Sequence, residues 1–287
     1  MALIINTNVP SLIAQRNLST NSKNLNKSLE KLASGYRINR AADDAAGLSI
    51  SETLRTQIRG TKQAIDNTQD GINILQIGEG AYVTISDNLQ RIRELTIQAA
   101  NDTNSTVERS AIALEVTERL EDINRIAATT RGSNVKLLDG SMSTFNLQIG
   151  ANASAETNAL NIGTVFQTST ISALGISQRL SVSINASTGV YRDGTNCRAF
   201  LNSIDAAITA VSERRSMLGA LQNRLESTVE NLSISVENLM TTESRIRNLD
   251  IAEESANLTK NQILQQASLN VLSQANQAPT LALKLLQ

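Results

Sequence analysis

The sequence predicts a mainly α-helical protein in which long antiparallel coiled-coil helices form a rod, with a small β-hairpin region in mid-chain. Two observations predict the helices. From residue 204 onward one apolar class recurs every seven residues, which is the spacing of a coiled coil. The two prolines, Pro10 and Pro279, stand near the ends of the 287-residue chain, so no proline forces a break between them. The mid-chain prediction rests on residues 130–198, where the helical period fails.

The carboxyl-terminal half carries the clearest heptad pattern. About fifty residues in one helix would extend roughly 75 Å, which is longer than a compact domain requires and favours a rod. The residues of this predicted seam are Ile204, Val211, Leu218, Leu225, Leu232, Leu239 and Ile246.

The amino-terminal half contains matching helical patterns. Residues 18–32 predict a short helix, and residues 58–89 predict a long one with an apolar residue every seven positions. After the "NDTNST" break, residues 107–127 predict a further amphipathic helix. The chain therefore folds back on itself, and both termini are expected at the same end of the rod.

The mid-chain segment has the alternation of short strands. "FNLQIG" and "RLSVSIN" alternate apolar and polar residues, and "RDGTN" is a turn signal. We therefore expect a small β-rich insertion at the far end of the helical hairpin.

The composition excludes most kinds of catalytic site. Aromatic residues make up 2% of the chain, there is no histidine, and Cys197 is the only cysteine. The chain thus lacks the commonest general base and metal ligand and cannot form an internal disulfide. A net charge of −1 and the scarcity of aromatics disfavour nucleic-acid binding. We expect no enzyme activity, no cofactor and no metal.

Neither a membrane anchor nor a secretory signal is predicted. No apolar run approaches eighteen residues, and the first eighteen residues lack a charged start followed by a long apolar stretch. Residues 1–42 carry six basic side chains and one acid, an imbalance found in transit peptides but explained equally well by an amphipathic helix.

The adjacent carboxylates Asp43 and Asp44 in "RINRAADDAAGLSI" could form an acid–base pair, half of a metal site or the start of a helix. Consecutive helical positions point about 100° apart, so the two carboxylates do not converge on one atom. Aspartate is favoured at helix starts, where it accepts hydrogen bonds from free N–H groups. Both residues are therefore predicted to cap the helix that follows.

Two long segments of the sequence resemble bacterial flagellin. The amino-terminal signature reads "LASGYRINRAADDAAGLSISETLRTQIRG", followed by "LQRIRELTIQAANDTNS". The carboxyl-terminal signature reads "RRSMLGALQNRLESTVENLSISVENLMTTESRIRNLDIAEE", followed by "ILQQASLNVLSQANQAP". The two signatures lie within roughly the first 140 and the last 90 residues, in the expected order.

The resemblance implies a subunit that self-assembles into the flagellar filament outside the cell and serves motility. It implies an inner coiled coil of residues 1–43 with 247–287 and an outer rod of residues 44–246. It also implies export in unfolded form by the flagellar type III route, without a cleaved signal peptide. The implied partners are further copies of the chain, an export chaperone at the carboxyl-terminal segment, and the filament cap and hook-associated proteins.

The resemblance also implies a recognition site for the host flagellin-sensing Toll-like receptor at Arg91, Leu95 and Glu115. From the residues alone, this stretch is either an ordinary exposed helix face with charge pairs or a protein-binding surface. Two features depart from the family pattern, namely "TRGSNVKLL", which lacks the usual Phe of the turn before "KLL", and Cys197.

Three other functions compete with a filament subunit. A hook–filament junction protein would share the terminal helices. An enzyme of this family would carry an inserted zinc-protease domain, which requires histidines that this chain does not have. A coiled-coil signalling module would not polymerise.

The terminal segments are predicted to fold only during assembly. Residues 1–43 and 247–287 have shorter apolar stripes than the rod. Alone, such helices bury too little surface to offset the entropy of ordering them.

Overall fold

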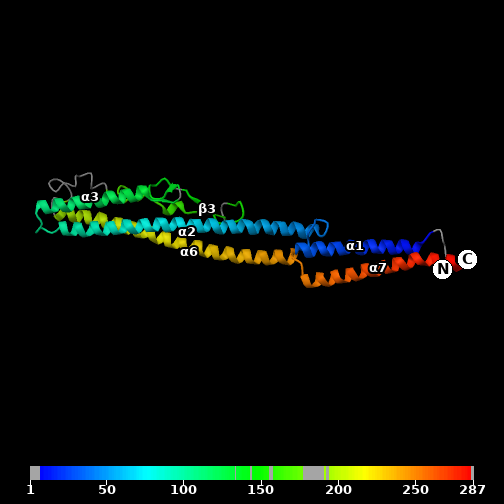
Figure 1. Cartoon of the computed structure of the whole chain (residues 1–287). Helices are drawn as coiled ribbons and strands as arrows, with labels where there is room; N and C mark the ends of the chain where they lie inside the picture. Colours follow the sequence, from blue (N-terminus) through cyan, green and yellow to red (C-terminus); the bar gives the residue numbers. More distant parts are fainter. Residues whose placement is uncertain are drawn as a thin grey trace. The chain divides into compact units, whose positions relative to one another are not determined.

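The computed structural model describes residues 7–132, 134–142, 144–154, 158–176, 191 and 194–285 (Figure 1). Within these residues, five long helices account for most of the chain. They are α1 (Val9–Ser34), α2 (Ala45–Ala99), α3 (Thr106–Thr129), α6 (Gly194–Arg247) and α7 (Ile251–Leu285). The mainly α fold class is confirmed.

Two small antiparallel hairpins interrupt the helices. Strand β1 (Arg131–Gly132) pairs with β2 (Val135–Lys136), and β3 (Asn146–Gln148) pairs with β4 (Ala159–Asn161). A 3-10 turn, η1 (Gly163–Val165), follows. Strand β3 confirms the strand expected in "FNLQIG". The strand expected in "RLSVSIN" lies outside the described residues.

The chain divides into two compact units. The terminal unit contains residues 1–58 and 237–287, and the central unit contains residues 59–236. This division falls inside helices α2 and α6, whereas the sequence predicted boundaries after residues 43 and 246. The predicted two-domain organisation, with 1–43 and 247–287 against 44–246, stays a prediction.

The core of the central unit is a layer of aliphatic side chains where α2, α3 and α6 lie side by side (Figure 1). Helix α3 begins with a capping box, in which the Ser105 side chain accepts from the Glu108 N–H and the Glu108 carboxylate accepts from the Ser105 N–H. Cys197 lies fully buried in this core, where it packs as a small apolar residue. The fully buried core residues of the three helices include Leu75, Ile85, Leu89, Ile92, Ile123, Ile204 and Leu218.

The mid-chain segment packs on a stripe of glycines along α2. A Cβ placed on Gly60 would lie 3.0 Å from the Ala151 Cβ, one on Gly71 would overlap Leu147, and one on Gly78 would overlap Phe166. The spacings of eleven and seven residues place the three glycines on one face of the helix. The absent side chains therefore leave the space that the mid-chain residues fill.

Buried and partly buried hydrogen bonds fix the same segment to α2 and α6. The Ser169 hydroxyl donates to the Tyr82 hydroxyl at 3.2 Å, and Arg214 Nη1 donates to Ser169 Oγ at 2.8 Å and to the Thr168 carbonyl at 3.0 Å. Burial raises the pKa of Tyr82, so its hydroxyl stays protonated. Because each buried polar group has a partner, the segment adds specificity as well as packing.

Two glycines two residues apart in α2 test this packing. Gly80 is exposed and has nothing within 4 Å of an added Cβ, so Gly80→Ala should raise the free energy of unfolding by up to about 1 kcal/mol, the helix-propensity difference. Gly78→Ala should lower it by about 1–2 kcal/mol, because the methyl group collides with the buried Phe166 ring. Urea unfolding of both variants measures this. Equal stabilisation by both substitutions would contradict the packing.

Candidate functional site

The loop between α1 and α2 joins the two terminal segments of the chain. Helix α1 ends at Gly35, which adopts a left-handed conformation with φ of 72° and donates to the Lys31 carbonyl. The next residues form a short antiparallel bridge with the turn between α6 and α7. Arg37 N–H donates to the Arg247 carbonyl at 2.7 Å, and Leu249 N–H donates to the Gly35 carbonyl at 3.1 Å. We call this region, residues 27–52 with 246–250, the junction.

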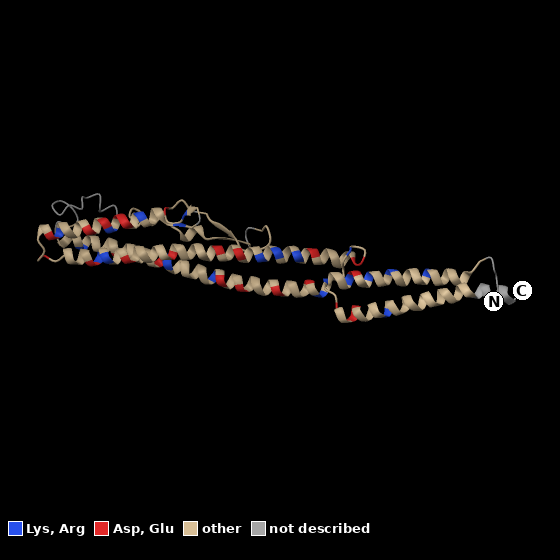
Figure 2. Ribbon diagram, in the orientation of Figure 1, with Lys and Arg blue, Asp and Glu red and all other residues tan. Residues whose placement is uncertain are grey.

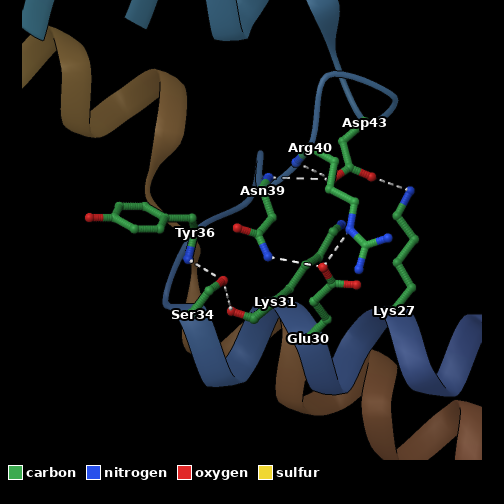
Figure 3. A network of polar contacts seen from close by, with 8 residues as sticks. All are labelled: Lys27, Glu30, Lys31, Ser34, Tyr36, Asn39, Arg40 and Asp43. Carbon is green, nitrogen blue, oxygen red and sulfur yellow. Dashed lines mark hydrogen bonds and ion pairs between the residues drawn. The ribbon is translucent and has the colours of Figure 1, made fainter. Parts of the chain in front are cut away.

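Asp43 is the centre of a polar network in the junction (Figure 3). Its carboxylate accepts from Lys27 Nζ at 2.7 Å and from the backbone N–H groups of Arg40 and Asn39 at 3.1 and 3.3 Å. Lys27 and these amides hold the pKa of Asp43 at about 2, below the ordinary value of 3.8. Asp43 therefore stabilises the loop and α1, and it does not cap α2 as expected from the sequence.

Asp44 holds the N-cap position of α2. Its carboxylate accepts from the Gly47 N–H at 2.9 Å, and its carbonyl accepts from the Leu48 N–H at 3.0 Å. The chain turns between the two aspartates. Asp43 therefore accepts hydrogen bonds from residues that precede it, whereas Asp44 accepts from a residue that follows it. Neighbouring acids in one loop thus stabilise different elements, a distinction that helical spacing did not reveal.

Arg247 also belongs to the junction, although no sequence pattern singled it out. Its guanidinium lies 4.6 Å from the centre of the Tyr36 ring, and Nη1 lies 3.0 Å from a Glu52 carboxylate oxygen. Only the fold brings these residues together, since they come from three separate segments. In the sequence, only the position of Tyr36 near the end of a helix could have pointed to this contact.

The seam between α1 and α7 is polar, in contrast to the core of the central unit. Ser11 Oγ donates to Asn276 Oδ1 at 2.8 Å, and Asn21 Nδ2 donates to Ser268 Oγ at 2.8 Å. Asn261 Nδ2 donates to Ser28 Oγ at 3.2 Å. The buried residues of α1 are accordingly small, namely Ser11, Ala14 and Ser28.

Asn8 closes this seam at its end. Its Oδ1 accepts from the Ser11 N–H and caps α1, while its Nδ2 donates to the Ala275 carbonyl at 2.8 Å. Pro279, four residues further on, has no N–H to donate to Ala275. Asn8 therefore supplies the hydrogen bond that the proline cannot make.

Several large apolar side chains of these two helices are exposed, while Leu18, Leu25, Leu32, Leu258 and Leu272 are half-buried. Leu12 is 61% exposed and Ile263 is 63% exposed. Their exposed neighbours are Ile13, Leu29, Leu264, Leu269 and Val271. We call this set the apolar outer face of α1 and α7.

The α2–α3 surface carries part of the predicted receptor site. Arg91 Nε donates to Glu115 at 3.2 Å, and its Nη1 donates to Glu94 at 3.1 Å, all three side chains being largely exposed. Leu95 does not share this surface, because it is 3% exposed and packs in the central core. Four residues after Arg91, the helix has turned about 40° further, which is enough to bury Leu95 between its neighbours. The receptor site expected at Arg91, Leu95 and Glu115 stays a prediction.

The predicted seam of α6 is buried along half of its length. Ile204, Val211, Leu218 and Leu225 are buried, whereas Leu232, Leu239 and Ile246 are half-buried. Helix α3 runs antiparallel to α2, with Glu115 level with Arg91, so α3 reaches only the part of α6 that precedes Leu232. The heptads continue after that point, but one of the helices that covered them has ended.

Chemical sites are scarce in the described part of the chain. No group of three or more potential metal ligands is clustered there. Among the described helices, none combines the length and apolar character needed to cross a membrane. A shallow groove of about 420 Å³ lies on α1 and α7, lined by polar and aliphatic residues such as Gln15, Leu18 and Leu269.

Long helices with an aliphatic core and exposed apolar side chains are typical of a helical protein that binds other chains. Residues 5–143 match the bacterial flagellin N-terminal helical region, and residues 201–286 match the bacterial flagellin C-terminal helical region. Flagellin of Halalkalibacterium halodurans is 45% identical over 285 residues, covering 99% of this chain and 100% of that protein. Flagellin of Bacillus subtilis strain 168 is 41% identical over 302 residues, covering 99% of each chain.

The chain belongs to the flagellin family, and the resemblance seen in the sequence is confirmed. It is a structural subunit and not an enzyme. The full-length relatives named flagellin favour a filament subunit over a hook–filament junction protein. The structure of a putative flagellar hook-associated protein from Vibrio parahaemolyticus shares the fold, with a TM-score of 0.61 and 14% identity over 72% of this chain and 100% of that one.

The two aspartates make a matched pair for a test of the junction. In polymerised protein at pH 7, Asp43→Asn should lower the urea midpoint of disassembly, because it loses the Lys27 ion pair; an exposed pair of this kind contributes less than about 1 kcal/mol. Since the folded pKa lies below the unfolded one, wild type keeps this advantage above pH 3.8 and loses it as the pH falls toward 2. The gap between wild type and variant should therefore close over that range.

Asp44→Asn is the control for this experiment. Asparagine caps helices about as well as aspartate, so this variant should have the urea midpoint of wild type both at pH 7 and between pH 3.8 and 2. A gap for Asp43→Asn that does not change with pH would contradict the assignment of the ion pair.

Proposed function

We propose that this chain polymerises into the flagellar filament through the apolar outer face of α1 and α7. The observation that carries the proposal is the set of exposed apolar side chains on helices that hydrogen bonds between polar side chains hold together. Hydrogen bonds between small and polar residues hold α1 to α7, while Leu12, Ile263 and their neighbours are left exposed. Exposed apolar surface of this extent marks an interaction site.

Further copies of the chain are the occupants that best fit this face. Polar residues within a helix seam specify pairing and register but lower the stability of the helix pair. Other contacts must then supply that stability. Contacts of the apolar outer face with neighbouring copies would recover it. The inner layer of the filament would then consist of residues 1–43 and 247–287, and the outer layer of residues 44–246.

The same reasoning supports coupled folding and assembly. A pair of helices with a polar seam buries little apolar area to offset the entropy of ordering α1 and α7, which have 26 and 35 residues. The terminal segments would be unfolded before assembly, which suits export in unfolded form by the flagellar type III route without a cleaved signal. An export chaperone would bind the carboxyl-terminal segment, and the filament cap and hook-associated proteins would be further partners.

A double substitution on the apolar outer face tests the proposal. Leu12→Ser with Ile263→Ser should leave the melting temperature of the monomer within experimental error, because both side chains are exposed. It should raise the critical concentration for polymerisation at least tenfold, as measured by sedimentation and electron microscopy. Polymerisation at the wild-type concentration would exclude this face as the assembly surface.

Limited proteolysis tests the folding of the termini independently. Protease should trim the monomer to a core near residues 44–246 that no longer polymerises, whereas filaments should resist. Equal protection of the termini in both forms would rule out coupled folding.

A second function, recognition by the host flagellin-sensing Toll-like receptor, rests on the exposed Arg91 and Glu115 pair. Arg91→Ala should keep the fold and reduce the response of receptor reporter cells to the monomer at least tenfold. Arg125→Ala is the control, because Arg125 forms a similar exposed ion pair with Asp122 on α3. Matching dose–response curves for the two variants would remove Arg91 from the site.

A further inference from the structure

Two exposed charged flanks of the central unit have no ion-pair partner among the described residues. The basic flank consists of Arg59 and Lys62 on α2, and the acidic flank consists of Glu226 and Glu230 on α6. Figure 2 shows that basic and acidic residues are interspersed along the helices. Each pair is spaced three or four residues apart and so lies on one side of its helix. From residue 226 to 243, α6 carries four glutamates and no basic residue. Exposed charges elsewhere, such as Arg93 and Asp205, do pair across the two helices.

The distance along the helices explains why these flanks do not neutralise each other within one chain. Gln222 contacts Glu79 and Asp205 contacts Arg93, which fixes how antiparallel α2 and α6 are aligned. With this alignment, Glu226 and Glu230 are level with residues 70–74 of α2. At 1.5 Å per residue they lie roughly 17 Å along the axis from Arg59 and Lys62, beyond the reach of the side chains.

Two acidic residues of α2 lie beside the acidic flank of α6. Asp66 and Asp70 are exposed and lie on the same stretch as Glu230. Within residues 59–236, the basic pair of α2 is therefore followed by an acidic stretch to which both helices contribute. A second copy displaced by this spacing brings Arg59 and Lys62 of one copy level with Glu226 and Glu230 of the other.

We infer that the basic flank of one copy contacts the acidic flank of the next copy beside it, with an axial shift of roughly 17 Å. This inference rests on the proposed function and names the lateral contact of that polymer. A contact between two different patches is heterologous and continues into a helical filament when the rotation does not close. Charge complementarity fixes the register of such a contact and suppresses the wrong one.

Charge reversal with compensation tests the contact. Arg59→Glu/Lys62→Glu gives two acidic flanks, and Glu226→Lys/Glu230→Lys gives two basic flanks. Each variant alone should polymerise at least tenfold less well than wild type at equal protein and salt concentration. An equimolar mixture should polymerise, because unlike copies alternate, and the chain with all four substitutions should polymerise alone.

A control reversal on α3 has the same change in charge. Glu118→Lys/Glu121→Lys alters two exposed glutamates that have no ion pair among the described residues, and it should polymerise like wild type. Circular dichroism of each monomer checks the fold, and rescue in the mixture shows independently that both variants are folded.

The outcomes separate this inference from the proposed function. If wild type does not polymerise, the proposed function fails. If wild type and both reversed variants polymerise equally, only the lateral contact fails. Failure of the mixture and of the fourfold variant to recover, or an equal loss in the α3 control, would also overturn the contact.

Discussion

The structure depends on how much apolar surface each long helix can bury against its neighbours. Helix α2 extends over 55 residues, and its stripe is covered by α3, α6 and the mid-chain segment in the central unit. From Leu232 onward, the seam residues Leu232, Leu239 and Ile246 of α6 are only half-buried. A stripe that continues beyond its intrachain partners needs partners from outside, which is what a polymerising subunit provides.

The terminal helices take this dependence further. Hydrogen bonds between Ser and Asn side chains join the two helices and specify their alignment. Asn8 completes the alignment by binding the carbonyl that Pro279 leaves without a donor. The junction then ties both helices to one another through main-chain bonds at Gly35 and Arg37. These hydrogen bonds set the alignment of the terminal helices within the chain.

Sequence periodicity predicted the long helices because their burial repeats every three to four residues. It predicted β3 from simple alternation. It did not separate Arg91 from Leu95, because the two lie on the same side of the helix by spacing, yet the boundary between surface and core passes between them. It failed at Asp43, since the direction of a loop carboxylate depends on the turn before the helix and on Lys27 sixteen residues earlier. The polar seam was missed because periodicity does not reveal which face meets which partner.

The few aromatic residues lie where heptads do not determine the packing. Phe166 fills the space above Gly78, and Tyr82 binds Ser169 of the same segment. Tyr191 packs edge-on against Phe200 and shares a hydrogen bond with Thr96. Tyr36 stacks under Arg247 in the junction. Aliphatic heptads serve contacts that repeat along a helix, whereas each of these irregular attachments needs one large side chain with a defined geometry. The 2% aromatic content therefore reflects how few such attachments a helical subunit requires.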